Sequence, residues 1–203
     1  LNDPFLLKGM VTAVARVRAA IAAGQKILVW GDYDVDGTTG TVLLRKALAS
    51  LGASTSFHIP NRFTEGYGLN QEYLAKAKAD GVGLVITVDC GTRSFDPIAW
   101  AQENGLDVIV TDHHLSDPER GIPAAAAVVN PNQAGCEYPD KQLAGVGVAL
   151  KLAQALIGDG GHPEQMNEFL EIAAIGTVAD VMKLTGENRS IVSLGLRQLT
   201  RTR

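Results

Sequence analysis

The chain has 203 residues, of which 46% are apolar and 20% charged, and its formal net charge is −4. This apolar content can form a sizeable core and excludes an intrinsically disordered chain. The longest uncharged stretch, residues 121–136, has 16 residues and contains two prolines, so no transmembrane helix is expected. Two cysteines are too few for a disulfide framework or a thiolate zinc site, and we expect a cytoplasmic protein.

Helical and strand-like patterns alternate along the chain. An amphipathic helix is expected over about 10–21, and short apolar runs rich in β-branched residues follow at 26–30, 56–60, 84–88, 107–111 and 126–129. Helical patterns separate the first four runs, at about 38–51, 70–80 and 95–104. Three more follow the last run, at about 141–157, 164–176 and 188–199.

Continuous apolar runs are typical of strands buried on both faces of a parallel sheet. We therefore predict an α/β fold: a mostly parallel five-stranded sheet flanked by helices, with a helical C-terminal part. We expect one catalytic domain over 1–203, with the strand–helix part at about 1–135 and the helical part at about 140–203.

Polar side chains follow the predicted strands. Ligands of open parallel sheets bind beyond the carboxyl ends of the strands, so these side chains are expected to share one edge. In chain order they are Asp32, Asp34 and Asp36, then Arg62, Asp89, and finally Asp112, His113 and His114.

One aspartate after a strand is most often a helix cap or a turn residue. Three carboxylates within five residues, Asp32 to Asp36, repel one another unless a cation holds them. Carboxylates and imidazole suit Mn²⁺ or Mg²⁺. Asp89 is central in the series and could bridge two such ions. If Asp180 and the five aspartates listed above are left out, the remaining residues have a formal net charge of +2. An anionic substrate is therefore allowed.

His113 and His114 are adjacent, and in an extended chain their side chains point to opposite sides. We therefore expect one to be a metal ligand and the other to face the substrate. The alternative is a core histidine beside an exposed one. His58 and His162 do not follow a predicted strand together with an aspartate as His113 and His114 do, and we interpret both as structural.

Three further segments allow two interpretations each. Asp180 lies in an apolar helical stretch, where an unpaired carboxylate is costly to bury, unless it marks a helix end or a surface position. Arg62, in the glycine-containing segment 61–68, could bind phosphate or belong to an ordinary loop. The segment 143–149 has two glycines but follows no strand, which favours close helix packing over nucleotide binding.

Six segments in order resemble the DHH phosphoesterase superfamily, and within it the RecJ-type, single-strand-specific 5′→3′ exonucleases. These are GDYDVDG (31–37), NRFTEGYG (61–68), VDCG (88–91), TDHH (111–114), LAGVGVA (143–149) and GTVADVM (176–182).

The resemblance implies two Mn²⁺ or Mg²⁺ ions held by Asp32, Asp34, Asp36, Asp89, His113 and Asp180. Asp89 would bridge them, with Asp36, His113 and Asp180 on one ion and Asp34 on the other. His114 would face the scissile phosphate, Asp112 would orient a ligand histidine, and Arg62 would hold a substrate phosphate.

The implied activity is hydrolysis of single-stranded DNA to 5′-nucleotides in DNA repair and recombination, without a covalent enzyme intermediate. RNA and short oligonucleotides are also allowed as substrates, and a single-strand-binding protein or a helicase as a partner. Two features depart from the superfamily. Trp30 stands where many relatives have a histidine ligand, and we expect Asp32 or water to substitute. A second, nucleic-acid-binding domain is expected to be absent from this chain.

Other functions remain open from sequence. The metals could serve a pyrophosphatase, or a phosphodiesterase for short oligonucleotides or cyclic dinucleotides. Trp30 would favour a non-catalytic nucleic-acid-binding scaffold, although the other carboxylates and histidines are intact. A phospho-accepting receiver domain shares the acidic strand ends but needs neither His113 and His114 nor the helical C-terminal part.

Overall fold

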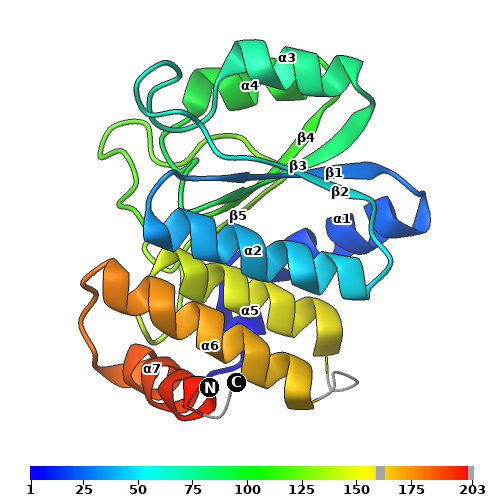
Figure 1. The fold of residues 1–203 in the computed structure, drawn as a ribbon. Coiled ribbons are helices and arrows are strands. Elements are labelled where there is room, and N and C mark those ends of the chain that lie inside the picture. The colour runs from blue at the N-terminus through cyan, green and yellow to red at the C-terminus, as the bar shows by residue number, and fades with distance from the viewer. Residues whose placement is uncertain (159–162, 201–203) are drawn as a thin grey trace.

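The computed structural model describes residues 1–158 and 163–200. Figure 1 shows how the elements of this part of the chain are arranged. In chain order these are η1 (Pro4–Leu6), α1 (Met10–Ala22), β1 (Lys26–Gly31), α2 (Val35–Ser50), β2 (Thr55–His58), α3 (Gln71–Ala79), β3 (Val82–Val88), α4 (Phe95–Glu103), β4 (Asp107–Thr111), β5 (Ala127–Val129), α5 (Gly145–Ile157), α6 (Pro163–Ala179) and α7 (Gly186–Leu199).

The five strands form one sheet in the order β2-β1-β3-β4-β5, and every neighbouring pair is parallel. This confirms the predicted parallel sheet flanked by helices. From β1 the chain passes to β2 on one side, and it then returns to β3 on the other side of β1. The strand order therefore reverses between β1 and β3. In such sheets the crevice at the reversal, beyond the carboxyl ends of the strands, is the usual ligand site.

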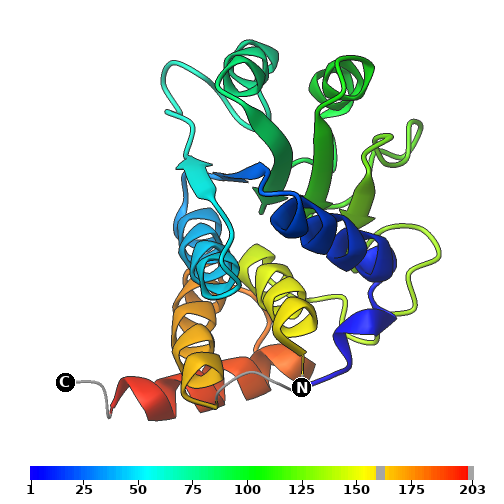
Figure 2. The same ribbon diagram turned by 90° about the vertical axis from the view of Figure 1, so that its right-hand side faces the viewer.

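Helices cover both faces of the sheet (Figures 1 and 2). Helices α3 and α4 lie on one face, and α1, α2 and α5 lie on the other. The sheet supplies both cores through the alternation of side chains along a strand. On β1, Leu28 and Trp30 pack into the core under α3 and α4, whereas Ile27 and Val29 pack into the larger core on the other side.

The two last helices form a further layer beyond α2 and α5 (Figure 1). Helix α5 is buried along nearly its whole length because it lies between the sheet and this layer. No helix within residues 1–158 and 163–200 has both the length and the apolar character that a membrane crossing requires.

A buried polar network ties the N-terminal segment to α5 and α7. Lys151 on α5 donates from Nζ to the carbonyl oxygen of Asn2 (2.5 Å), to Gln154 (2.8 Å) and to the carboxylate of Glu187 on α7 (2.9 Å). The hydroxyl of Tyr138 and the backbone N–H of Asn2 also donate to Glu187. Lys151 and Glu187 therefore form a buried ion pair in which both partners have several hydrogen bonds.

Three local predictions were inaccurate. Strand β2 is an edge strand with Phe57 53% exposed, so it is not buried on both faces as its sequence suggested. Helix α2 begins at Val35 rather than at about 38, because Asp34 caps it by accepting from the N–H of Gly37 at 2.8 Å. Helix α5 begins at Gly145 rather than at about 141.

Candidate metal centre

Three aspartates lie in a row across the carboxyl edge of the sheet. Asp32, Asp89 and Asp112 directly follow β1, β3 and β4. Each donates its backbone N–H to the carbonyl oxygen of the last residue of the next strand, at 3.0–3.2 Å, so the sheet hydrogen bonding extends one residue into the site. All three side chains are buried. Asp89 has a φ of +63°, a left-handed conformation that aspartate tolerates better than most residues.

Asp36 is held by the N-terminus of α5. It is buried in the first turn of α2, and its two oxygens accept the N–H groups of Gly145 (2.6 Å) and Val146 (2.7 Å). Ala144 gives α5 no side-chain cap, so Asp36 takes that place. A Cβ on Gly145 would lie 2.5 Å from the Asp89 carboxylate, so only glycine fits here.

The segment 143–149 is thus close helix packing, as predicted, but it packs on site carboxylates, which we did not predict. A sequence signal for this contact does exist: the predicted helix has no serine, threonine, aspartate or asparagine at its start to cap it. Such a helix leaves N–H groups for an acidic side chain from another element.

Asp34 and Asp180 both lie at a helix end, a position that can explain an aspartate without any ligand. For Asp34 this explanation applies in part, because one of its oxygens caps α2. Asp180 directly follows α6, but no helix N–H binds its Oδ2, which is 3.7 Å from Nε2 of His113. Val181 has a φ of +56°, which is strained for a β-branched residue and turns the chain immediately after Asp180.

His113 and His114 turn to the same side, so the prediction of opposite sides was wrong. The backbone N–H groups of both donate to one oxygen of Asp112, which folds the chain into a turn instead of an extended segment. Nε2 of His113 is 3.1 Å from Oδ1 of Asp89, and Nδ1 of His114 is 3.9 Å from it. The two rings are 4.7 Å apart, and both face the acidic cluster.

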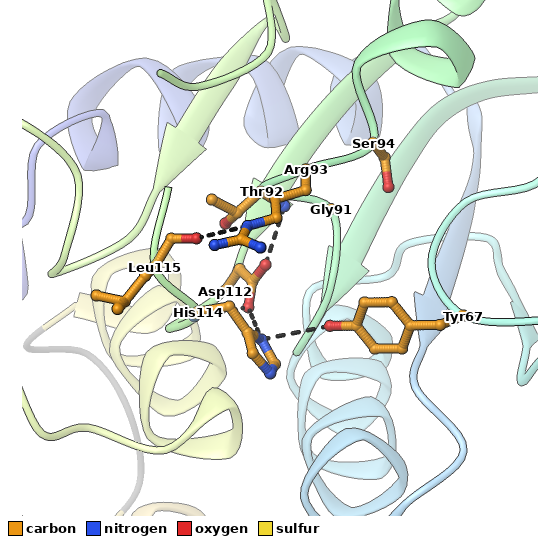
Figure 3. A pocket seen from close by; sticks show the side chains of 8 residues that line it. All are labelled: Tyr67, Gly91, Thr92, Arg93, Ser94, Asp112, His114 and Leu115. Carbon is orange, nitrogen blue, oxygen red and sulfur yellow. Dashed lines mark hydrogen bonds and ion pairs between the residues drawn. The ribbon is translucent and has the colours of Figure 1, made fainter. Parts of the chain in front are cut away.

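Asp112 orients His114 (Figure 3). Its Oδ1 is 2.7 Å from Nδ1 of His114, and its Oδ2 accepts the N–H of Thr92 at 2.9 Å. We expected Asp112 to orient the ligand histidine, His113, but it binds only the backbone N–H of that residue. The side chain that it orients is that of His114, the histidine predicted to face the substrate. The hydrogen bond to Asp112 raises the pKa of His114. Although burial acts in the opposite direction, the hydrogen bond with His114 holds the pKa of Asp112 below its usual value.

Three overlapping groups of side chains could each hold a metal ion, with ligand atoms within 4.8 Å of one another. Asp89 belongs to two of them. The groups are Asp36, His113 and Asp180; Asp32, Asp34 and Asp89; and Asp89, His113 and His114.

The donor atoms fit a hard divalent cation. Oδ1 of Asp32, Oδ1 of Asp89 and Oδ2 of Asp180 are buried and accept no hydrogen bond, although the Asp89 oxygen is only 3.1 Å from the ring of His113. Buried carboxylate oxygens without partners are rare, because each costs the free energy of lost hydration. A cation bound between them would supply the missing partner.

The acidity of the cluster also departs from that of free carboxylates. Burial, and then the charge of neighbouring aspartates, raises the pKa of Asp89 to about 10. Burial raises the pKa of Asp36 to about 6, although the N–H of Val146 opposes the effect. Burial also raises the pKa values of Asp32 and Asp180. These carboxylates therefore repel one another, and a cation would let them ionise.

Trp30 does not reach the metal cluster. Its ring is fully buried under α3, 5.2 Å from the ring of Tyr73 and 4.5 Å from that of His58. Asp32, two residues on, belongs to the cluster instead, so Trp30 no longer favours a non-catalytic scaffold. His58 has the structural role that we predicted, because it pairs with Glu65 (2.6 Å) and stacks on Tyr73. The prediction for His162 lies outside the described residues.

The loop 61–68 reaches the site with a residue that we did not predict. The hydroxyl of Tyr67 is 3.3 Å from the carbonyl oxygen of Asp89 and 3.4 Å from Nδ1 of His114 (Figure 3). An aromatic residue between glycines in a loop is the only sequence signal for it. Arg62 is exposed, with its guanidinium 4.7 Å from the ring centre of Tyr33, the residue after Asp32.

Comparison with known proteins places these residues in a family. The model for the DHH family, N-terminal domain, matches residues 26–177. The chain belongs to the DHH family. The matched stretch contains every aspartate and histidine of the cluster except Asp180, which lies three residues beyond its end.

This DHH chain is similar to proteins described as RecJ. It is 49% identical to the single-stranded-DNA-specific exonuclease RecJ of Bacillus subtilis (strain 168) over 200 residues, which is 98% of this chain and 25% of that protein. Among solved structures, an exonuclease RecJ bound to manganese superposes with a TM-score of 0.84 and 40% identity, covering 94% of this chain and 48% of that one.

RecJ of Thermus thermophilus in complex with Mn²⁺ has a TM-score of 0.81 and 36% identity, covering 97% of this chain and 28% of that one. The chain thus spans between a quarter and a half of the length of these relatives.

Proposed function

We propose that this chain is the catalytic domain of a metal-dependent, RecJ-type exonuclease that degrades single-stranded DNA in the 5′→3′ direction and releases 5′-nucleotides. The observation that carries the proposal is the convergence of buried carboxylates with unpartnered oxygens around His113. It occurs in a chain that is 40% identical to an exonuclease RecJ bound to manganese. The catalytic domain would extend over 1–203, with a strand–helix part and a helical part.

Two Mn²⁺ or Mg²⁺ ions would be held by the cluster. Asp36, His113 and Asp180 would bind one ion, and Asp32 and Asp34 would bind the other. Asp89 would contribute to both, because it forms a ligand group with Asp32 and Asp34 and its Oδ1 lies 3.1 Å from Nε2 of His113. When bound, two such ions stabilise the charge on the attacking and leaving oxygens of an in-line phosphoryl displacement.

His114 would bind a non-bridging oxygen of the scissile phosphate. The hydrogen bond between Asp112 and Nδ1 fixes the orientation of the ring and favours its protonated form, which leaves Nε2 as a donor. A histidinium beside the phosphate would neutralise part of the negative charge that develops during hydrolysis. Asp112 therefore acts through His114, as a positioning residue.

Arg62 would bind a phosphate of the DNA strand. Its guanidinium is exposed over the ring of Tyr33 and is free to form a bidentate contact. The loop that carries Arg62 is fixed at its base: Glu65 accepts the N–H of Asn61 at 3.0 Å and pairs with His58 at 2.6 Å. These two contacts limit the motion of the loop, so Arg62 and Tyr67 are held near the cluster.

Three finer predictions follow from similarity to the RecJ proteins. The cellular function would be DNA repair and recombination in the cytoplasm. A single-strand-binding protein or a helicase would be a partner, and RNA or short oligonucleotides would be secondary substrates. Each of these remains a prediction.

The experiment that tests the function is release of mononucleotides from 5′-phosphorylated single-stranded DNA in the presence of Mn²⁺. Asp89→Ala should abolish release, because it removes the carboxylate shared by both ions. Asp96→Asn is the matched control, since Asp96 is exposed on α4 and pairs with Arg120. Unchanged hydrolysis in Asp89→Ala would refute the proposal. Hydrolysis of a dinucleotide or pyrophosphate alone would favour a phosphodiesterase or pyrophosphatase of the same superfamily.

A further inference from the structure

A cavity of about 430 Å³ opens beside the metal cluster and is not explained by metal binding. His114 and Asp112 line it together with Tyr67 and Leu115, and the segment from Gly91 to Ser94 completes the wall. We call it the nucleotide pocket. In Figure 3 the side chains of Leu115 and Tyr67 lie on opposite sides of His114. The same histidine thus borders the acidic cluster and the pocket.

The size of the pocket suits a small organic ligand. Ligand pockets in proteins have volumes of roughly 300–1,000 Å³, which includes the space that one nucleotide needs. The phenol ring of Tyr67 and the side chain of Leu115, which is 69% exposed, supply apolar surface. A nucleoside has apolar ring faces and a few polar edges, and this wall could contact both.

The charge of the pocket suits an anion. Among the described residues that line it, Asp112 is the only carboxylate, and both of its oxygens are already bound by His114 and the N–H of Thr92. Arg93 is the arginine among the residues that line the pocket. Its Nε donates to the carbonyl oxygen of Leu115 at 3.1 Å. That bond fixes the guanidinium at the pocket.

The outer nitrogens of Arg93 remain for a ligand. Among residues 1–158 and 163–200, they form no ion pair or hydrogen bond, in contrast to Nε. The backbone N–H groups of Arg120 and Glu119 bind the carboxylate of Asp117 and hold its pKa below the usual value, and the charge of Arg93 makes a smaller contribution. A planar guanidinium with free N–H groups is well suited to a phosphate.

We propose that the nucleotide pocket binds the nucleotide unit next to the scissile phosphodiester, with Arg93 on its phosphate and with Tyr67 and Leu115 around its nucleoside. The inference rests on the proposed function, because it takes the scissile phosphate to lie at His114. A strand whose phosphate lies there has its adjacent nucleotide within reach of the pocket. Arg93 is then a substrate-binding residue additional to Arg62.

The test is titration of the 203-residue chain with thymidine 5′-monophosphate in saturating Mn²⁺, followed by calorimetry. Arg93→Gln should weaken binding about tenfold, as expected for loss of one charged hydrogen bond. Leu115→Ala should weaken binding of the nucleotide but not of inorganic phosphate. Arg120→Gln is the matched control, since Arg120 is an exposed arginine that stacks on Phe95 outside the pocket, and its affinity should equal that of wild type.

Equal affinities of wild type and Arg93→Gln would overturn the inference, as would an equal loss in Arg120→Gln. Mn²⁺-dependent hydrolysis of bis(p-nitrophenyl) phosphate by wild type, lost in Asp89→Ala, tests the proposed function separately. Arg93-dependent nucleotide binding without hydrolysis would retain the pocket and refute the catalytic function. Hydrolysis with Arg93-independent binding would refute the pocket alone.

Discussion

Among residues 1–158 and 163–200, buried charged side chains gather in two clusters, which differ in how their charges are balanced. In the network around Lys151 and Glu187, one cation meets one anion, and both have several hydrogen bonds. Although burial acts in the opposite direction, the hydrogen bonds from Tyr138 and Lys151 lower the pKa of Glu187. This cluster is complete within the chain, and it joins the N-terminal segment to α5 and α7.

In the cluster at the carboxyl edge of the sheet, the buried charges and hydrogen-bond acceptors are not balanced by partners within the chain. Carboxylates outnumber the two histidines there, and Asp32, Asp89 and Asp180 each have a buried oxygen without a hydrogen bond. The pKa of Asp89 is raised above its usual value, whereas the pKa of Glu187 is lowered. Buried charge by itself therefore does not indicate function. Charge that the chain leaves unbalanced indicates a ligand.

The largest effect is expected from breaking the balanced pair. Lys151→Met leaves Glu187 buried without its cation and should lower the free energy of unfolding by about 3–5 kcal/mol, measured by urea denaturation. The double variant Lys151→Met/Glu187→Leu should recover most of that loss, because no buried charge then remains unpaired. A loss below about 1 kcal/mol in the single variant would show that the pair is not what balances this cluster.

A metal should stabilise the unbalanced cluster. Mn²⁺ at about one hundred times its Kd should raise the free energy of unfolding by about 2.7 kcal/mol for each ion bound, since it binds only the folded chain. The gain should be smaller in Asp89→Asn, which loses a ligand shared by both ions, and should persist in Asp96→Asn. Equal stabilisation of all three proteins in thermal or urea unfolding would place the metal elsewhere.

The metal-free protein should lose stability as pH rises. Asp89 and Asp36 keep protons in the folded state at pH values where the unfolded chain has released them, because their folded pKa values are about 10 and 6. Their contribution is therefore complete below about pH 4 and is lost as pH rises through those values. Each such group changes stability by at most about 1.4 kcal/mol per pH unit.

Urea denaturation of the metal-free protein at about pH 5, 7 and 9 measures this slope. Asp89→Asn cannot ionise at that position, so its stability should fall less steeply across this range. Parallel slopes for wild type and Asp89→Asn would show that Asp89 is ionised in the folded state without metal.

The smallest effect concerns the strained turn after Asp180. Val181→Gly should raise the free energy of unfolding by about 1 kcal/mol, because glycine adopts a φ of +56° without strain. Val178→Gly, at an exposed position in the last turn of α6, is the matched control and should lower it by roughly 0.3–0.5 kcal/mol. A loss of stability in Val181→Gly would mean that the turn is not strained.

Much of the fold and part of the site follow from local sequence. Apolar runs predicted all five strands, and a parallel sheet brings residues that follow its strands to one edge. The strand pattern alone therefore groups Asp32, Asp89 and Asp112. Asp180 needed the resemblance to a family, because an apolar helical pattern does not distinguish a helix end from its interior.

Other features depend on contacts that no local pattern encodes. Asp36 meets the N-terminus of α5 109 residues later in the chain, and this contact exists only once both helices pack on the sheet. The side to which His113 and His114 turn depends on two hydrogen bonds to Asp112 that break the extended chain. Tyr67 contacts His114 because the loop that carries it folds over the site. The glycines and polar residues of that loop do not determine its path, so the contact could not be predicted from sequence.

The central claim is that the carboxyl edge of the sheet holds two divalent cations that share Asp89. The most direct test is the number of Mn²⁺ ions bound per chain, measured by calorimetric titration and by metal analysis after dialysis. Two ions are expected for wild type and for Asp96→Asn, and fewer than two for Asp89→Asn. No bound Mn²⁺ in wild type, or two ions in Asp89→Asn, would contradict it.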